Sequence, residues 1–153
     1  MSDQTAVPAY NKPLPEPNTT SLPFWEGARE HRLRIQRSKK TGRHVFYPRN
    51  VSPFGAGDEL DWVDASGRGI VYAFTVARRP TAPQWAQDVP YVIAIVALEE
   101  GPHLTTNIVG CPPEEVTIGM PVVAVFEDVT PEVTLVKFGP ASPANGASSE
   151  QTP

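Results

Sequence analysis

Residues 36–57 read QRSKKTGRHVFYPRNVSPFGAG, which has the spacing of a zinc ribbon but contains no cysteine. Cysteines at Ser38, Thr41, Ser52 and Gly55 would give C-x-x-C and C-P-x-C pairs separated by ten residues, a spacing that suits four thiolates around one zinc ion. A hydroxyl is a poor substitute for a thiolate at a structural zinc site, and glycine has no ligand atom. The segment therefore predicts a ribbon that binds no zinc.

The residues around this segment predict a helix and a hairpin. Ser21 has the position of an N-cap before a helix at 22–31, with Pro23 in its first turn and apolar residues on one face. Two short strands, 33–36 and 44–47, flank a turn in which Gly42 can take a positive backbone angle. The hairpin forms the first half of the ribbon.

Strand patterns separated by turn residues follow the glycines at 55 and 57. They are 60–63, 69–77, 91–98, 103–109, 122–126 and 133–138. In the second, Ile70, Tyr72, Phe74 and Val76 alternate with smaller residues, as expected of a strand with one buried face. About five principal strands after a small N-terminal unit predict a mainly β fold with a closed or partly open barrel. An OB-fold is the smallest architecture with that count.

Length and composition predict one soluble domain with a small appendage. The 153 residues are 40% hydrophobic and 20% charged, with one cysteine, no signal sequence and no apolar run that spans a membrane, so we expect a cytoplasmic protein. Eight of the 18 prolines fall before Phe24 or after Gly139. We therefore expect extended or disordered tails at 1–21 and 140–153, a helix and degenerate ribbon at 22–57, and an OB-fold at 58–139.

The basic residues are concentrated in one segment. Eight of the thirteen Lys and Arg lie between Arg29 and Arg49 against a single acid, Glu30, and the rest of the chain has five basic and sixteen acidic residues. Nucleic acid, a phosphorylated cofactor or an acidic protein surface would be attracted to this segment, and a solvated hairpin face is the alternative. The predicted barrel itself has few basic residues, which argues against nucleic acid.

One connection, RRPTAPQWAQDVP at 78–90, is longer than a hairpin needs. Loops of this length in a compact domain are often binding loops or lids, and this one joins the first two barrel strands, on the side of an OB-fold that commonly binds ligand. The alternative is a proline-stiffened surface loop whose Trp85 folds back onto the barrel.

Catalytic motifs are missing from the sequence. No Ser-His-Asp order, nucleophile elbow, Walker loop, dinucleotide fingerprint or H-E-x-x-H motif occurs, and the histidines at 31, 44 and 103 lack the spacing of a metal site. We interpret Cys111 as a structural cysteine, and the acids at 58, 59, 61 and 64 as an exposed strand face. The sequence predicts no catalytic residue in this chain.

The order of segments resembles a known family. FWEGAREHRLRIQR, the ribbon-spaced segment, GRGIVYAFTVARRP, DVPYVIAIVALEEGPHLTTNIVG and IGMPVVAVFEDVTPEVTLVKFGP, which together span residues 22–140, are similar to the zinc-ribbon OB-fold proteins called domain of unknown function 35. The resemblance implies a helical arm, a rubredoxin-like ribbon and a C-terminal OB-fold. This chain departs from the family at the four metal-ligand positions, none of which is a cysteine.

The resemblance also implies a function in acyl-CoA metabolism. Members of the family pair with thiolase-like enzymes, including ketoacyl thiolases and the aldolases of steroid side-chain degradation, and the catalytic residues belong to the partner. We therefore expect an accessory subunit, inactive alone, of a heterotetramer with a thiolase-like thiolase or retro-aldol lyase. A partner of an enoyl-CoA hydratase and a free-standing module that binds single-stranded nucleic acid are the alternatives.

Two groups of residues are candidates for these contacts. Position and residue type suggest that Arg78 and Arg79 contact the phosphates of acyl-CoA while Trp85 or Tyr91 packs on its adenine or acyl group. The partner interface is expected at four aromatic residues of the arm and hairpin, because a small ribbon cannot bury so many of them: Phe24, Trp25, Phe46 and Tyr47. The alternative is an arm that packs on its own barrel. We expect no covalently bound cofactor and no zinc.

Overall fold

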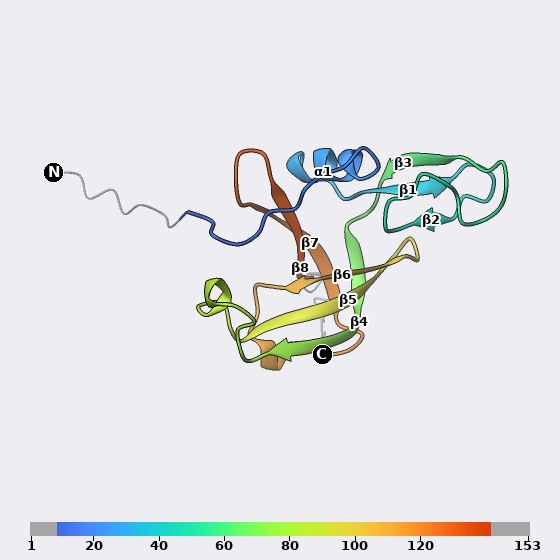
Figure 1. Ribbon diagram of the computed structural model, residues 1–153. Helices are drawn as coiled ribbons and strands as arrows, with labels where there is room; N and C mark the ends of the chain where they lie inside the picture. Colours follow the sequence, from blue (N-terminus) through green and yellow to red (C-terminus); the bar gives the residue numbers. More distant parts are fainter. Residues whose placement is uncertain (1–8, 142–153) are drawn as a thin grey trace, which may run out of the picture.

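The computed structural model describes residues 9–141, and the tail predictions for 1–8 and 142–153 lie outside this range. A single α-helix precedes eight strands, and two short 3₁₀ helices lie in the loops (Figure 1). The elements are α1 (Leu22–Arg29), β1 (Arg34–Ser38), β2 (His44–Val45), β3 (Leu60–Asp64), β4 (Arg68–Ala77), η1 (Pro83–Trp85), β5 (Tyr91–Leu98), β6 (His103–Ile108), η2 (Pro113–Glu115), β7 (Pro121–Asp128) and β8 (Thr134–Pro140). The predicted mainly β class is confirmed.

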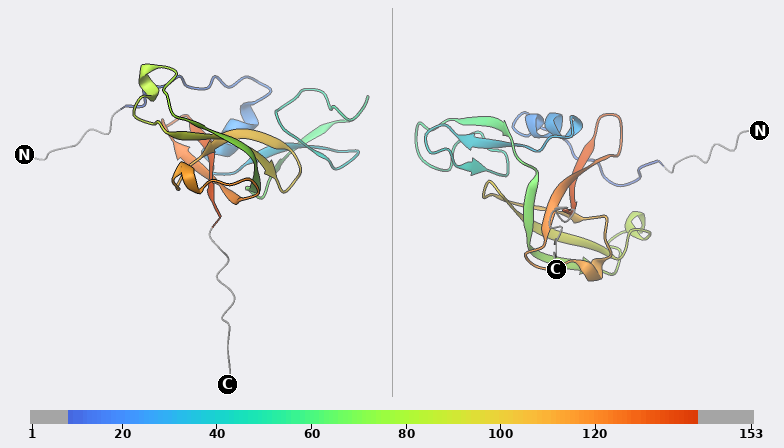
Figure 2. Two further views of the ribbon diagram at one scale, coloured as in Figure 1. Left: turned by 90° about the horizontal axis from the view of Figure 1, so that it is seen from below. Right: turned by 180° about the vertical axis from the view of Figure 1, so that it is seen from behind.

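The strands form two sheets. The barrel is closed, with strand order β4-β5-β6-β8-β7, and a three-stranded sheet with order β2-β1-β3 projects from its side (Figures 1 and 2). We counted strand 60–63 with the barrel, but β3 pairs antiparallel with β1 over its whole length, from Arg34 opposite Asp64 to Ser38 opposite Leu60. The ribbon sheet therefore continues to Asp64, and the barrel strands begin at Arg68.

The pairing of β1 with β3 also explains part of the basic segment. Arg34 donates hydrogen bonds to Asp64 and Glu30, Arg32 contacts Asp64, and Lys39 lies 2.6 Å from Glu59. The acids that we interpreted as an exposed strand face thus neutralise three of the eight basic residues across the strand pair. Each exposed pair contributes little to stability, because water and salt screen its charges.

The first half of β4 buries a residue that the alternating pattern did not assign to the core. Along β4, Val71 is fully buried, whereas Ile70 and Tyr72 are 45% and 56% exposed. The register between β4 and β5 shifts between Val71 and Ala73, so a β-bulge reverses the inward and outward positions. After the bulge, Phe74 packs against the core, as the alternation predicts.

The ribbon and the barrel share a continuous core. Leu33, just before β1, and Ile35, within it, are buried in one cluster with barrel residues such as Val96 and Phe138. Burial of apolar side chains is the largest favourable term in folding. Packing against the barrel therefore supplies stability to a ribbon that is predicted to have no metal.

Helix α1 lies across the top of the barrel, beside the ribbon (Figure 1). It ends two residues before the predicted boundary, since His31 takes a left-handed backbone conformation with φ of 56°. The His31 ring stacks on Phe126 of β7, with 5.3 Å between ring centroids, and its Nε2 lies 3.0 Å from Asp128. This contact fixes the end of the helix to the barrel.

Residues 9–20 lie along the barrel without forming a helix or strand. Lys12 forms an ion pair with Asp88 of the long loop, and the Thr20 hydroxyl donates to Asn50 of the ribbon at 2.8 Å. Between residues 9 and 141, no helix is long and apolar enough to cross a membrane.

Candidate functional site

The four residues at the zinc-ligand positions do not form a metal site. Ser38 and Ser52 are buried, and their hydroxyls accept hydrogen bonds from the backbone N–H groups of Thr41 and Phe54, at 2.9 and 3.2 Å. In place of a metal ion, the carboxylate of Asp58 accepts from the Ser52 hydroxyl and from the Lys40 N–H, the latter at 3.1 Å. Hydroxyl groups and a single carboxylate lack the soft donors that a structural zinc site needs.

The charge of Asp58 is favoured in this position. The Ser52 hydroxyl lowers the pKa of Asp58 below its usual range, and the Ser38 hydroxyl and the Lys40 N–H lower it further. The carboxylate is therefore ionised at neutral pH and links the two halves of the ribbon. Among residues 9–141, no group of three or more His, Cys, Asp or Glu is arranged to hold a metal ion.

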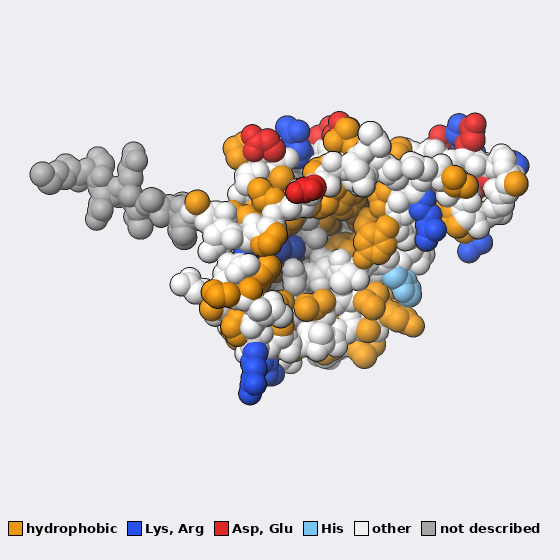
Figure 3. All heavy atoms as spheres, in the orientation of Figure 1, with side chains coloured by type: hydrophobic (Ala, Val, Ile, Leu, Met, Phe, Trp, Pro, Cys, Tyr) orange, Lys and Arg blue, Asp and Glu red, His pale blue; other side chains and the backbone are white. Residues whose placement is uncertain are grey.

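The four aromatic residues of the arm and hairpin lie together. Phe24 contacts Trp25 edge-on at 5.0 Å between centroids and Phe46 at 5.5 Å, while Phe46 and Tyr47 are 4.3 Å apart. With β6 and β8 they line a hollow of about 330 Å³, here called the aromatic pocket. Figure 3 shows hydrophobic side chains around a hollow in the centre of this face. Phe24 packs against the core of the protein, whereas Tyr47 is 54% exposed, and the partner interface at these residues stays a prediction.

Trp85 and Tyr91 line a second hollow of about 410 Å³, the loop pocket. Its positive charges are already paired, Lys12 with Asp88 and Lys137 with Glu127. The pocket therefore has little free positive charge for a phosphate group. The aromatic and loop pockets share Asn107, Leu135 and Lys137, so they form one groove over β6 and β8.

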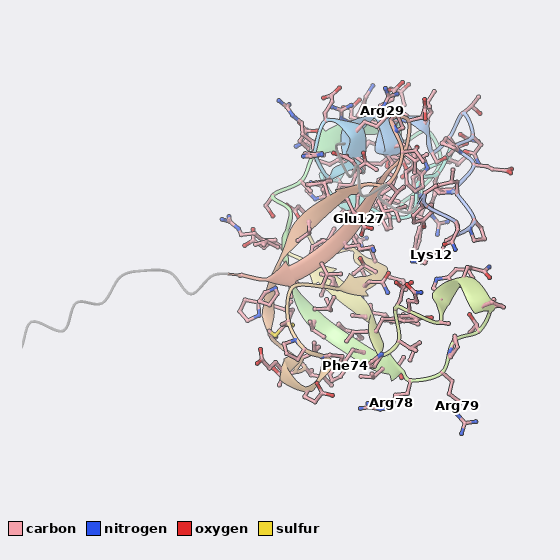
Figure 4. The ribbon with its side chains drawn as sticks, turned by 90° about the vertical axis from the view of Figure 1, so that its left-hand side faces the viewer. Lys12, Arg29, Phe74, Arg78, Arg79 and Glu127 are labelled. Carbon is pink, nitrogen blue, oxygen red and sulfur yellow. The ribbon has the colours of Figure 1, made fainter. Side chains whose placement is uncertain are left out.

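Arg78 and Arg79 do not lie in this groove. Both side chains are exposed and point away from the barrel, at some distance from Lys12 and Glu127 (Figure 4). They directly follow β4, and the chain then turns through η1 before Trp85 reaches the pocket. The structure thus brings Trp85 and Tyr91 together but separates the two arginines from them.

Cys111 also lines the loop pocket, but its thiol is not activated. Burial raises the pKa of Cys111, and the nearby charge of Glu115 raises it further. Since the thiolate is the nucleophilic form, the thiol is unreactive at neutral pH. This agrees with the interpretation of Cys111 as a structural residue.

The outer face of β4 and β5 was not identified from the sequence. Ile70, Tyr72, Ile93 and Ile95 all point outward there and are between 36% and 56% exposed. The alternation of apolar residues along β4 is visible in the sequence. Which of these residues face outward depends on the β-bulge, which the sequence does not show. This apolar barrel face is a second candidate contact surface.

A helical arm, a three-stranded ribbon and a closed five-stranded barrel define a ribbon-plus-OB-fold protein. Residues 62–127 match the family model of the ChsH2 C-terminal OB-fold domain, and residues 25–51 match that of the ChsH2 rubredoxin-like zinc ribbon domain. Archaeal DUF35 domain-containing scaffold proteins are also similar. That of Methanothermobacter thermautotrophicus is 39% identical over 58% of this chain and 68% of its own length. The chain belongs to the DUF35 family, as its segment order indicated.

A solved structure described as an Ltp2-ChsH2(DUF35) aldolase matches with a TM-score of 0.76 and 39% identity, over 84% of this chain and the whole of that chain. A probable enoyl-CoA hydratase alpha subunit of Thermomonospora curvata is 41% identical over 89% of this chain. The 3-oxo-4,17-pregnadiene-20-carboxyl-CoA hydratase alpha subunit of Mycobacterium tuberculosis is 37% identical over 76%. This chain spans only 42% and 36% of the length of these two subunits.

Proposed function

We propose that the protein is a non-catalytic accessory subunit of a hetero-oligomeric enzyme that acts on acyl-CoA thioesters. The observation that carries the proposal is the aromatic pocket, where four aromatic side chains from two separate elements surround an open apolar hollow. A solvent-exposed apolar surface of this kind is typical of a contact with another protein. The raised pKa of the Cys111 thiol, which makes it a poor nucleophile, fits a subunit whose partner performs the chemistry.

The partner that we propose is a thiolase-like retro-aldol lyase. The similarity to the DUF35 chain of an aldolase supports this choice, because that chain is covered over its whole length. Steroid side-chain or similar acyl-CoA breakdown is the specific reaction that we propose, with this chain as part of a heterotetramer. In this arrangement the partner covers the groove, and Trp85 and Tyr91 contact the acyl end of the substrate.

A partner related to enoyl-CoA hydratases is the second candidate. It is favoured by the two hydratase alpha subunits, since this chain is similar to a part of each. The two candidates differ in the bond that the complex breaks or forms. The aldolase cleaves a carbon-carbon bond of a β-hydroxyacyl-CoA, whereas the hydratase adds water to an enoyl-CoA.

The experiment is co-expression with a thiolase-like protein encoded beside this chain, followed by size-exclusion chromatography and assays for carbon-carbon cleavage and for hydration. We expect a stable complex that cleaves a carbon-carbon bond of the acyl-CoA substrate only when both chains are present. Hydration without cleavage would instead favour the second candidate. Two separate peaks, with no effect on activity, would contradict the accessory role.

The interface is tested by substitutions of comparable exposed residues. Trp25→Ala together with Tyr47→Ala should abolish co-purification, because the pair removes two aromatic contacts of the proposed interface. Tyr72→Ala is the matched control, as Tyr72 is 56% exposed but lies on the outer face of β4. Loss of the complex on Tyr72→Ala, with retention in the double variant, would move the interface to the barrel face.

A further inference from the structure

A third hollow lies outside the groove, between the ribbon and the barrel. The turn between β5 and β6 reaches toward β2 (Figure 1), and residues of this turn and of segments 41–49 and 53–54 enclose a space of about 570 Å³. We call it the ribbon cleft. Its volume lies within the range of about 300–1,000 Å³ that small-molecule sites occupy. Phe46 lines both the ribbon cleft and the aromatic pocket, so the two spaces are adjacent.

The cleft carries an excess of positive charge, from two arginines against the single carboxylate of Glu100. Arg43 and Arg49 line it together with His44. Within residues 9–141, neither arginine forms a salt bridge, in contrast to Arg32, Arg34 and Lys39 of the same basic segment. Guanidinium groups are well suited to phosphate, because they donate paired hydrogen bonds in a fixed plane.

The Arg43 side chain and the Arg49 backbone are held by the surrounding structure. The Arg43 guanidinium lies over the ring of Phe54, 4.2 Å from its centroid. The backbone of Arg49 is fixed by the buried side chain of Gln36, which accepts from the Arg49 N–H at 2.7 Å and donates to its carbonyl at 2.8 Å. Groups fixed in advance lose less entropy when a ligand binds.

The cleft also has an unsatisfied hydrogen-bond acceptor. Glu100, at its edge, accepts the Ser66 N–H through Oε1 at 2.6 Å. Its Oε2 is the one buried side-chain oxygen or nitrogen without a hydrogen-bond partner in the part of the chain that the structure describes. Buried polar atoms are rarely left unpaired, because the loss of hydration is costly. Because Glu100 lines the cleft, a turn of its side chain would bring this oxygen to a hydroxyl or amino donor of a ligand.

Together these groups select a ligand with phosphate, an aromatic ring and a donor group. We propose that the ribbon cleft binds the nucleotide end of an acyl-CoA, with Arg43 and Arg49 on its phosphates, the Phe54 region against the adenine and Glu100 accepting from a ribose hydroxyl or an amine. The choice of CoA among nucleotides rests on the proposed function. The acyl chain would then leave the cleft past Phe46 and enter the groove that the partner covers.

Adenosine 3′,5′-bisphosphate, which is the nucleotide end of CoA without the outer phosphate of its diphosphate and without the pantetheine arm, is the probe. It is titrated into the full chain alone and into the complex by isothermal calorimetry. We expect binding that Arg43→Ala and Arg49→Ala each weaken about tenfold or more, since each removes charge-assisted hydrogen bonds. Adenosine without phosphate should bind more weakly than the bisphosphate. Arg78→Ala with Arg79→Ala is the control and should leave the affinity unchanged.

Two results would overturn the inference. One is no binding of the bisphosphate to either the chain or the complex, and the other is binding that Arg43→Ala and Arg49→Ala leave unchanged. Sensitivity to Arg78→Ala with Arg79→Ala would instead assign the phosphates to the long loop. The charge-reversing variants Arg43→Glu and Arg49→Glu repeat the test, and an unchanged thermal unfolding midpoint shows that a variant is folded. Failure of the proposed function is separate, because it appears as the absence of a complex in size-exclusion chromatography.

Discussion

The packing of α1 on the ribbon predicts that Gly27→Ala lowers the stability of the protein, whereas helix propensity alone would predict a gain. Gly27 lies inside α1, and a Cβ placed there would lie 2.7 Å from the Cβ of Arg34 and 3.1 Å from the carbonyl oxygen of Arg32. Carbon atoms in contact normally lie about 3.5–4.0 Å apart, so the first contact is too short by about 0.8 Å. Neither atom can move without the backbone of residues 32–34, which leads into β1, because the oxygen belongs to that backbone and the Cβ is directly attached to it.

We expect Gly27→Ala to destabilise the protein despite the preference of helices for alanine. Alanine is favoured over glycine in a helix interior by about 0.8–1.0 kcal/mol. Overpacking in a well-packed interior costs about 1–3 kcal/mol. The net change in the free energy of unfolding is therefore a loss of up to about 2 kcal/mol if α1 keeps its position. If α1 shifts, the stability loss is smaller, but Phe24 and Trp25 move away from Phe46.

Urea unfolding followed by far-UV circular dichroism measures the stability, and co-purification with the partner measures the position of α1. Glu26→Ala is the matched control, since Glu26 is exposed in the same helix and should change stability by less than about 0.5 kcal/mol. A Gly27→Ala protein that is about 1 kcal/mol more stable than the wild type, with unchanged partner affinity, would refute this account of the contact.

Three further predictions concern the ribbon and the core. Asp58→Asn should lower the urea midpoint at pH 7. Because the pKa of Asp58 is lowered in the folded protein, its contribution to stability is present above the ordinary value of 3.8 and is lost as pH falls through the folded value, so the difference between the two proteins should shrink as the pH is lowered below 3.8. Equal sensitivity of both proteins to acid would argue against this link. Excess EDTA should leave the thermal midpoint unchanged, and metal analysis that finds one zinc per chain would show that the metal-free ribbon is wrong. Phe138→Ala should cost about 3–5 kcal/mol in urea unfolding, since Phe138 is fully buried in the shared core, and a loss below 1 kcal/mol would contradict that role.

Much of the fold was predictable because its signals are local. Alternating apolar residues and turn residues marked the barrel strands, and all five barrel strands lie within a few residues of their expected positions. The partner of β3 was not predictable in this way. Its pairing with β1 depends on a connection of more than twenty residues through β2, and strand patterns carry no information on which strands pair.

Which of the predicted site residues lie together has physical reasons that particular residues show. Trp85 and Tyr91 share a pocket because the loop between β4 and β5 folds back on the barrel. Arg78 and Arg79 were grouped with them by sequence distance, but the chain leaves β4 in another direction at these residues. Asp58 was assigned to an exposed face since its link to Ser52 depends on the folded ribbon. The Glu100 oxygen without a hydrogen-bond partner could not be predicted from the sequence either, because its surroundings also depend on the folded structure.

The closure of the barrel has a consequence for its motions. Strands β6 and β8 run parallel but form one ladder pair, Ile108 opposite Phe138, whereas β7 and β8 are paired along seven positions. Two residues before that pair on each strand, the Thr106 hydroxyl donates a hydrogen bond to the Val136 carbonyl at 3.1 Å, where a ladder would have a backbone hydrogen bond. Local opening occurs where few backbone hydrogen bonds must break. Amide hydrogen exchange should therefore be fastest along this seam, which is also the floor of the groove, and a bound partner should slow it there first.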